Sequence, residues 1–158
     1  MTTKKRTRRA MSPARALAGN PVRHAVMESQ LKRVLAELQT DVGLQVYIGG
    51  NAKTIVKRAG MLCFVANNCA AARGLPPDSG DVRILGGMAS TLMDLARPGE
   101  DVERHRGALR SGVAACQRIL QDTDVWTAGQ AFVMASSYVN RPNAMAQAVQ
   151  QAQQTQPA

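Results

Sequence analysis

Cationic side chains near the N-terminal end are the residues of this chain best suited to chemistry with a partner. Seven of them, and no acid, occupy the first 27 positions: Lys4, Lys5, Arg6, Arg8, Arg9, Arg15 and Arg23. Residues 28–158 hold 13 Lys/Arg against 11 Asp/Glu, so they carry +2 of the total net charge of +9. Clustered cations attract polyanions, and nucleic acid is the commonest large polyanion that a soluble protein meets. The pattern therefore predicts an arm that binds phosphates.

A second, smaller group of cations lies in the body of the chain. Lys53, Lys57 and Arg58 fall on the first turns of a predicted helix, where Lys53 and Lys57 share a face because they are four apart. Aromatic residues make up only 3 % of the chain, too few to provide stacking platforms for unpaired bases. Binding through phosphates alone would be independent of base sequence and strongly salt-dependent.

The remaining reactive residues do not form a catalytic or metal-binding pattern. The two histidines, His24 and His105, stand far apart in the sequence, and His105 falls on a helix face that we expect to be exposed. Cys63 and Cys69 are six apart, on different faces of a helix, so they cannot hold one metal ion together. With Cys116, they are expected to be small buried hydrophobic residues. We expect no enzymatic activity, no cofactor and no metal.

Composition indicates one reduced, water-exposed domain. An odd number of cysteines, three, without a C-x-x-C pair favours free thiols and a cytoplasmic location. No apolar run approaches the ~20 residues that span a bilayer, so no membrane partner is expected. Hydrophobic residues are 45 % of the chain but few are aromatic, which favours a core of Ala, Leu, Val, Ile and Met on helices.

Apolar residues at spacings of three and four predict an all-α fold. Asn20-Pro21 and Asn51 are helix-start signals, and Gly74 followed by Pro76-Pro77 is a stop signal. The predicted helices cover about 21–39 with a continuation toward 48, 52–73, 80–96, 101–121 and 125–140. The expected architecture is a compact bundle of four to five helices at 20–140, after a disordered basic arm at 1–19 and before a frayed Ala/Gln-rich tail at 141–158. Glycines inside the helices predict close helix packing.

Part of the chain resembles a group of small helical proteins. The shared layout is a basic arm, Asn20-Pro21 opening a helix, a second helix with an Ala/Asn-rich segment at 64–74, and a third ending in Leu-Met-Asp-Leu-Ala at 92–96. In this layout the chain is similar, over about residues 20–97, to small all-helical proteins of unknown function from proteobacteria and their phages and plasmids. The resemblance implies an all-α fold and a mobile-element setting, and it implies no catalytic residue.

Two functional hypotheses follow. In the first, the protein is a non-enzymatic, nucleic-acid-associated accessory protein whose arm binds phosphates and whose helical body supplies self-association or partner docking. In the second, it is a protein–protein interaction module, such as an inhibitor, an adaptor or a virion component. A helical surface would then meet the partner, and the arm would be drawn to an acidic protein surface.

Overall fold

Five helices form the part of the chain that the computed structural model describes, residues 20–138. They are α2 (Pro21–Tyr47), α3 (Ala52–Ala72), α4 (Gly80–Leu95), α5 (Val102–Gln121) and α6 (Val125–Tyr138). No strand occurs within 20–138, so the all-α helical bundle is confirmed. The predicted arm at 1–19 and tail at 141–158 lie outside the described residues.

Side chains at the helix ends explain where the helices begin and stop. The Asn20 side chain accepts a hydrogen bond from the Arg23 amide at 3.1 Å, and Asn51 accepts one from the Thr54 amide at 2.8 Å. Gly74 has a φ of +66°, the left-handed conformation that lets the Leu75 amide bond back to the Ala70 carbonyl and close α3. The start and stop signals predicted from the sequence are therefore confirmed.

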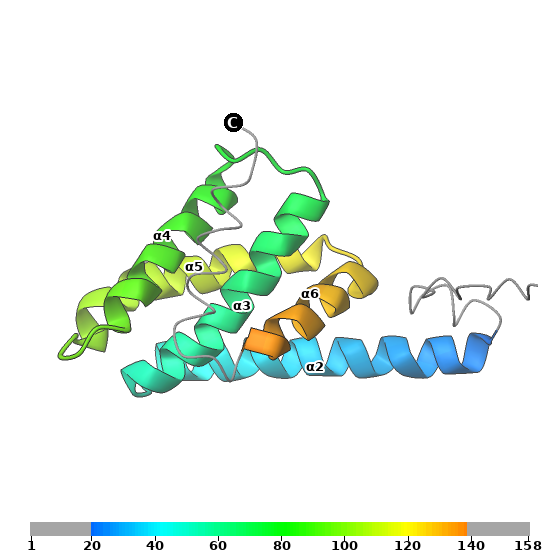
Figure 1. Ribbon diagram of the computed structural model, residues 1–158, viewed down its shortest axis with the longest axis horizontal. Helices are drawn as coiled ribbons and strands as arrows, with labels where there is room; N and C mark the ends of the chain where they lie inside the picture. The colour runs from blue at the N-terminus through cyan, green and yellow to red at the C-terminus, as the bar shows by residue number, and fades with distance from the viewer. Residues whose placement is uncertain (1–19, 139–158) are drawn as a thin grey trace, which may run out of the picture.

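Helix α2 extends beyond the segment in which apolar residues recur most regularly. The segment after residue 39 has mixed signals, yet α2 continues through Gly43 to Tyr47 as one helix (Figure 1). Val42 and Val46 are each only 1 % exposed, so burial of this face against the bundle outweighs the cost of an internal glycine. The expected continuation of the helix is confirmed.

Helix α3 is the centre of the bundle. It contacts each of the other four helices, and Figure 1 shows it crossing α2 with α4 and α6 on either side. Every residue from 59 to 67 is buried. Burial therefore extends around the helix beyond a single apolar stripe and includes Gly60, Met61 and Phe64. Small residues around α3 allow several helices to approach it at once.

Two helical glycines mark close contacts between helices. A Cβ at Gly112 of α5 would lie 2.5 Å from the sulfur of Met88 on α4. A Cβ at Gly129 of α6 would lie 2.8 Å from the Cδ1 of Leu31 on α2. Gly87 and Gly107 have open space instead, so the predicted role of glycine in close packing holds at some positions and not at others.

The N-terminal half of α2 extends along α6 (Figure 1). His24 of α2 meets Trp126 of α6 with ring centroids 4.6 Å apart, near the end of the bundle. The opposite side of α2 carries exposed apolar residues, among them Val22 and Val26. None of the helices within 20–138 is long and apolar enough to cross a membrane.

Candidate functional site

The cations predicted to bind phosphate do not all lie together. Six of them, Lys4, Lys5, Arg6, Arg8, Arg9 and Arg15, fall outside the described residues. Arg23 lies on the first turn of α2, whereas Lys53, Lys57 and Arg58 lie on the first turns of α3, at the other end of α2 (Figure 1). Arg58 contacts Asp41 of α2, 18 residues after Arg23, so at about 1.5 Å per residue Arg23 lies roughly 27 Å along α2 from the nearest part of this group. Arg23 therefore does not share a surface with the three cations of α3.

The group on α3 contains two lysines that are free to bind and one arginine that is not. Lys53 and Lys57 are exposed and form no ion pair within 20–138. Arg58 is held by Asp41 of α2, with Nε 2.9 Å from the carboxylate Oδ2. This bond joins the two helices across their connecting turn. It reduces the charge that Arg58 can offer to a phosphate.

Ion pairs neutralise much of the charge on the helical body. Residues 20–138 hold 13 Lys/Arg and 11 Asp/Glu. Six of these cations contact a carboxylate: Lys32 with Glu28, Arg33 with Glu37, Arg58 with Asp41, Arg97 with Asp94, Arg106 with Glu103, and Arg118 with Asp81. Exposed pairs of this kind contribute only ~0–1 kcal/mol each to stability. Their main effect is on the surface potential, because each removes a local positive centre.

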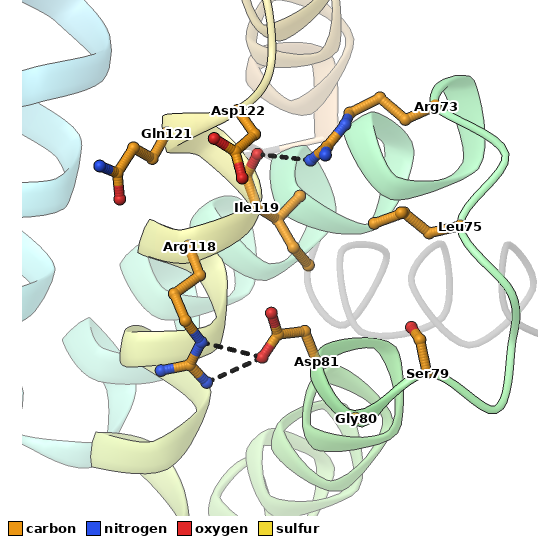
Figure 2. Close-up of a pocket in the computed structure, with 9 residues that line it drawn as sticks. All are labelled: Arg73, Leu75, Ser79, Gly80, Asp81, Arg118, Ile119, Gln121 and Asp122. Carbon is orange, nitrogen blue, oxygen red and sulfur yellow. Dashed lines mark hydrogen bonds and ion pairs between the residues drawn. The ribbon is translucent and has the colours of Figure 1, made fainter.

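A cleft of about 520 Å³ lies where α3 ends, α4 begins and α5 ends (Figure 2). Arg118 of α5 donates two hydrogen bonds to one carboxylate oxygen of Asp81, from Nε at 2.9 Å and Nη2 at 2.8 Å. Arg73 of α3 donates from Nη1 to the carbonyl oxygen of Ile119 at 3.1 Å. Both arginines lining the cleft are therefore already bonded to protein groups.

The electrostatics of this cleft do not favour an anion. The start of a helix attracts negative charge, but at α4 the carboxylate of Asp81 already occupies the first turn. Asp122 adds a second negative charge to the lining of the cleft. The cleft functions as a polar connection that holds the ends of α3, α4 and α5 together.

Each histidine contacts a neighbouring side chain. The His24 ring is tilted by 44° against the Trp126 ring, so it packs between α2 and α6. His105 contacts the Glu100 carboxylate, with Nε2 3.2 Å from Oε2. Its side chain is only 22 % exposed, which corrects the expectation of an exposed histidine: α5 turns this residue toward the segment just before it.

All three cysteines are buried and free, as predicted. Burial raises the pKa of the Cys63 thiol to about 12 and that of Cys69 to about 11, and it also raises the pKa of Cys116. Because the thiolate is the nucleophile and the metal ligand, these protonated thiols are poorly reactive. Within residues 20–138, no three His, Cys, Asp or Glu side chains are grouped closely enough to hold a metal ion.

A surface that sequence reasoning missed lies on α2. Leu44, Tyr47 and Ile48 are exposed, and they border a shallow groove of about 560 Å³ that reaches Gln117 of α5. The guanidinium of Arg110 lies 4.9 Å from the centre of the Tyr47 ring, which holds this aromatic side chain in place. In the sequence, these three apolar residues lie off the helix face that carries the buried Val42 and Val46, and this was the feature that could have revealed the surface.

Comparison with known proteins does not assign this chain to a family. No protein-family model, no curated protein and no solved structure matches it. The resemblance to small helical proteins of proteobacteria and their mobile elements therefore stays a prediction, and the functional conclusion depends on the residues themselves.

Proposed function

We propose that this protein is a non-enzymatic, nucleic-acid-associated accessory protein that binds phosphates through its basic N-terminal arm. The observation that supports this proposal is the separation of charge between the arm and the body. Residues 1–19 contain six Lys/Arg and no acid, whereas residues 20–138 contain 13 Lys/Arg and 11 Asp/Glu. The excess positive charge is therefore concentrated at one end of the chain.

The ion pairs of the body strengthen this contrast. A cation that already contacts a carboxylate has less to gain from a phosphate, and six body cations are in that position. The arm has no acid of its own with which to pair. Lys53 and Lys57 are exposed and unpaired within 20–138, and they are the best body candidates for an additional phosphate contact.

Inert thiols and packed histidines support the non-enzymatic part of the proposal. The raised pKa values of Cys63 and Cys69 keep both thiols protonated at neutral pH. A cytoplasmic location and an origin in a bacterial mobile element are part of the same proposal. The first rests on the free cysteines and the second on the resemblance described above.

A gel-shift comparison tests the role of the arm. The full chain and a variant that lacks residues 1–12, and with them five cations, are titrated onto one duplex DNA at low and at high salt. The full chain should bind at low salt and release at high salt, and the shortened chain should bind weakly at both. The matched control is Lys53→Gln/Lys57→Gln, which should reduce binding much less. Equal, salt-insensitive binding by the full and shortened chains would contradict the proposal.

The second candidate, a protein–protein interaction module, is favoured by exposed apolar side chains. Val22, Leu44 and Ile48 on α2, and Val133 on α6, are all more than half exposed. Large apolar side chains in water are typical of contact surfaces when they are grouped. Recovery of one stoichiometric protein partner after nuclease treatment would favour this function over the first.

A further inference from the structure

Six residues form a straight stripe along the face of α2 that points away from the bundle. They are separated alternately by four and seven positions: Val22, Val26, Arg33, Glu37, Leu44 and Ile48. Four plus seven gives an eleven-residue repeat, which is just over three full helical turns, so the stripe drifts little around the helix. Ile48 follows the last helical residue and keeps helical backbone angles, so it continues the stripe.

This outer stripe is exposed along its whole length. The four aliphatic side chains are between 52 % and 77 % exposed, and the side chains of Arg33 and Glu37 are 81 % and 64 % exposed. No other helix within 20–138 covers it. Isolated exposed aliphatic residues are ordinary on protein surfaces, but here two neighbouring aliphatic residues at each end of one helix face leave two apolar patches in water.

The order of residue types along the stripe is symmetric. Aliphatic residues occupy both ends, Val22 and Val26 at one and Leu44 and Ile48 at the other, and the oppositely charged Arg33 and Glu37 occupy the centre. Reversing the direction of the helix therefore places an aliphatic residue on an aliphatic one and a cation on an anion. A surface that is complementary to its own reversed copy is what a two-fold symmetric interface requires.

We propose that two copies of this chain pair through their outer stripes, with the two α2 helices antiparallel. The register is set by the symmetry of the stripe. It places Val22 opposite Ile48 of the second copy, Val26 opposite Leu44, and Arg33 opposite Glu37. Each of these pairs occurs twice in the dimer. Arg33 and Glu37, which contact each other at 2.9 Å within one helix, then also face their counterparts in the second copy.

Charge complementarity selects the antiparallel arrangement over the parallel one. In a parallel pair in register, Arg33 would face Arg33 and Glu37 would face Glu37, and like charges opposed at an interface are repulsive. In the antiparallel pair each of these residues faces its opposite. Antiparallel helices also place the positive end of one helix dipole beside the negative end of the other.

The groove beside α2 can receive the aliphatic residues from one end of the second copy's outer stripe. It is about 560 Å³ in volume, and Leu44, Tyr47 and Ile48 line it together with Thr40. In the proposed register, Val22 and Val26 of the second copy lie over this part of α2. The outer stripe and the groove are next to each other, so the dimer would cover both apolar features at once.

Sedimentation equilibrium of the full chain tests the proposal directly. The chain has a mass of 16.9 kDa, and we expect twice this mass at tens of micromolar concentration. Val26→Lys and Leu44→Lys should each weaken the dimer more than tenfold, because each change places two lysines in the apolar ends. The matched control is Val133→Lys, which changes an exposed valine on α6 and should leave the mass unchanged. A monomer at all concentrations, or a dimer that resists both α2 variants, would overturn the proposal.

Cysteine cross-linking tests the orientation. A mixture of the Val26→Cys and Leu44→Cys variants should form a disulfide-linked dimer under mild oxidation. Neither variant alone should do so, because in the antiparallel pair equal positions are roughly 27 Å apart, at 1.5 Å for each of the 18 intervening steps. The native cysteines are buried and do not compete. Cross-linking of either variant with itself would indicate a parallel pair. A monomer whose new cysteine resists labelling would show that another part of the same chain covers the stripe, and either result would overturn the proposal.

Discussion

The side chain of Met88 on α4 fills the space next to Gly112 on α5. A Cβ at position 112 would lie 2.5 Å from the sulfur of Met88 and 2.7 Å from its Cβ. Met88 is 1 % exposed and cannot move into solvent. The two helices therefore approach each other closely only because residue 112 has no side chain. This close approach explains why a glycine, which is unfavourable inside a helix, occupies the position.

Gly112→Ala should destabilise the protein by about 1–3 kcal/mol, the usual cost of adding a methyl group to a packed core. The contact includes the Met88 Cβ as well as the mobile end of that side chain, so rotation alone cannot relieve it. The matched control is Gly107→Ala on the same helix, where a Cβ meets nothing within 4 Å. That change should raise stability by up to about 1 kcal/mol. Urea unfolding measures both, and a neutral Gly112→Ala would contradict the close packing of α4 on α5.

Asn67 is fully buried on α3, and neither its amide nitrogen nor its amide oxygen has a hydrogen-bond partner within 20–138. Asn67→Leu, an apolar residue of similar size, should raise the free energy of unfolding by about 1–3 kcal/mol, because an unpaired polar group is removed from the core. Asn68→Leu is the control, since the Asn68 amide already donates to the Phe64 carbonyl oxygen at 2.9 Å. A loss of stability in Asn67→Leu would show that this amide is hydrogen-bonded in solution.

The buried thiols predict a loss of stability at alkaline pH. Folding raises the pKa of Cys63 to about 12 and of Cys69 to about 11, from an ordinary value of 9.0. Above pH 9 the unfolded chain loses these protons while the folded chain keeps them. Deprotonation therefore stabilises the unfolded state relative to the folded one. Stability should be fully retained below about pH 9 and should fall as pH rises toward 11–12.

A variant with all three cysteines replaced by alanine is the control for this pH dependence. Lysines and tyrosines also titrate in this range, so the cysteine contribution is the part of the slope that the variant lacks. Iodoacetamide gives an independent measurement: at pH 8 it should label the native protein far more slowly than the protein in urea. An identical alkaline slope in both proteins, or rapid labelling of the native thiols, would contradict burial of these cysteines.

The cleft in Figure 2 should contribute to stability through Asp81. Asp81→Asn removes the charge that Arg118 holds at 2.8 Å and that the start of α4 favours, and it should cost about 1 kcal/mol. Asp78→Asn, an exposed residue before α4, should cost nothing measurable. Thermal unfolding at low and high salt distinguishes the two, because the cost at Asp81 should shrink as salt screens it. Equal effects at both positions would contradict this role.

Local signals in the sequence were sufficient to predict the helices. Asn20, Asn51 and Gly74 act through backbone groups a few residues away, so their roles can be derived without knowing the fold. The central position of α3 could not be derived in this way. Its Ala, Gly and Cys residues are small enough to be buried on any side, and which sides are covered depends on helices that follow later in the chain.

Pairing between distant residues explains why the candidate site was only partly predictable. Arg58 is bonded to Asp41, and Arg118 to Asp81, 37 positions away. Such contacts decide which cations remain available to a partner, and they depend on how the helices pack. The outer stripe of α2 was visible in the sequence, but exposure of all six residues was needed to recognise it as a surface.

The salt dependence of DNA binding tests the central claim most directly. The observed binding constant of the full chain is measured on one duplex DNA at several salt concentrations, and again for the chain without residues 1–12. If the six arm cations contact phosphates, the plot of log Kobs against log salt should have a slope of roughly −5 for the full chain and about −1 for the shortened one, which keeps only Arg15 of the six. The same slope for both chains, or no binding by the full chain at low salt, would contradict the account.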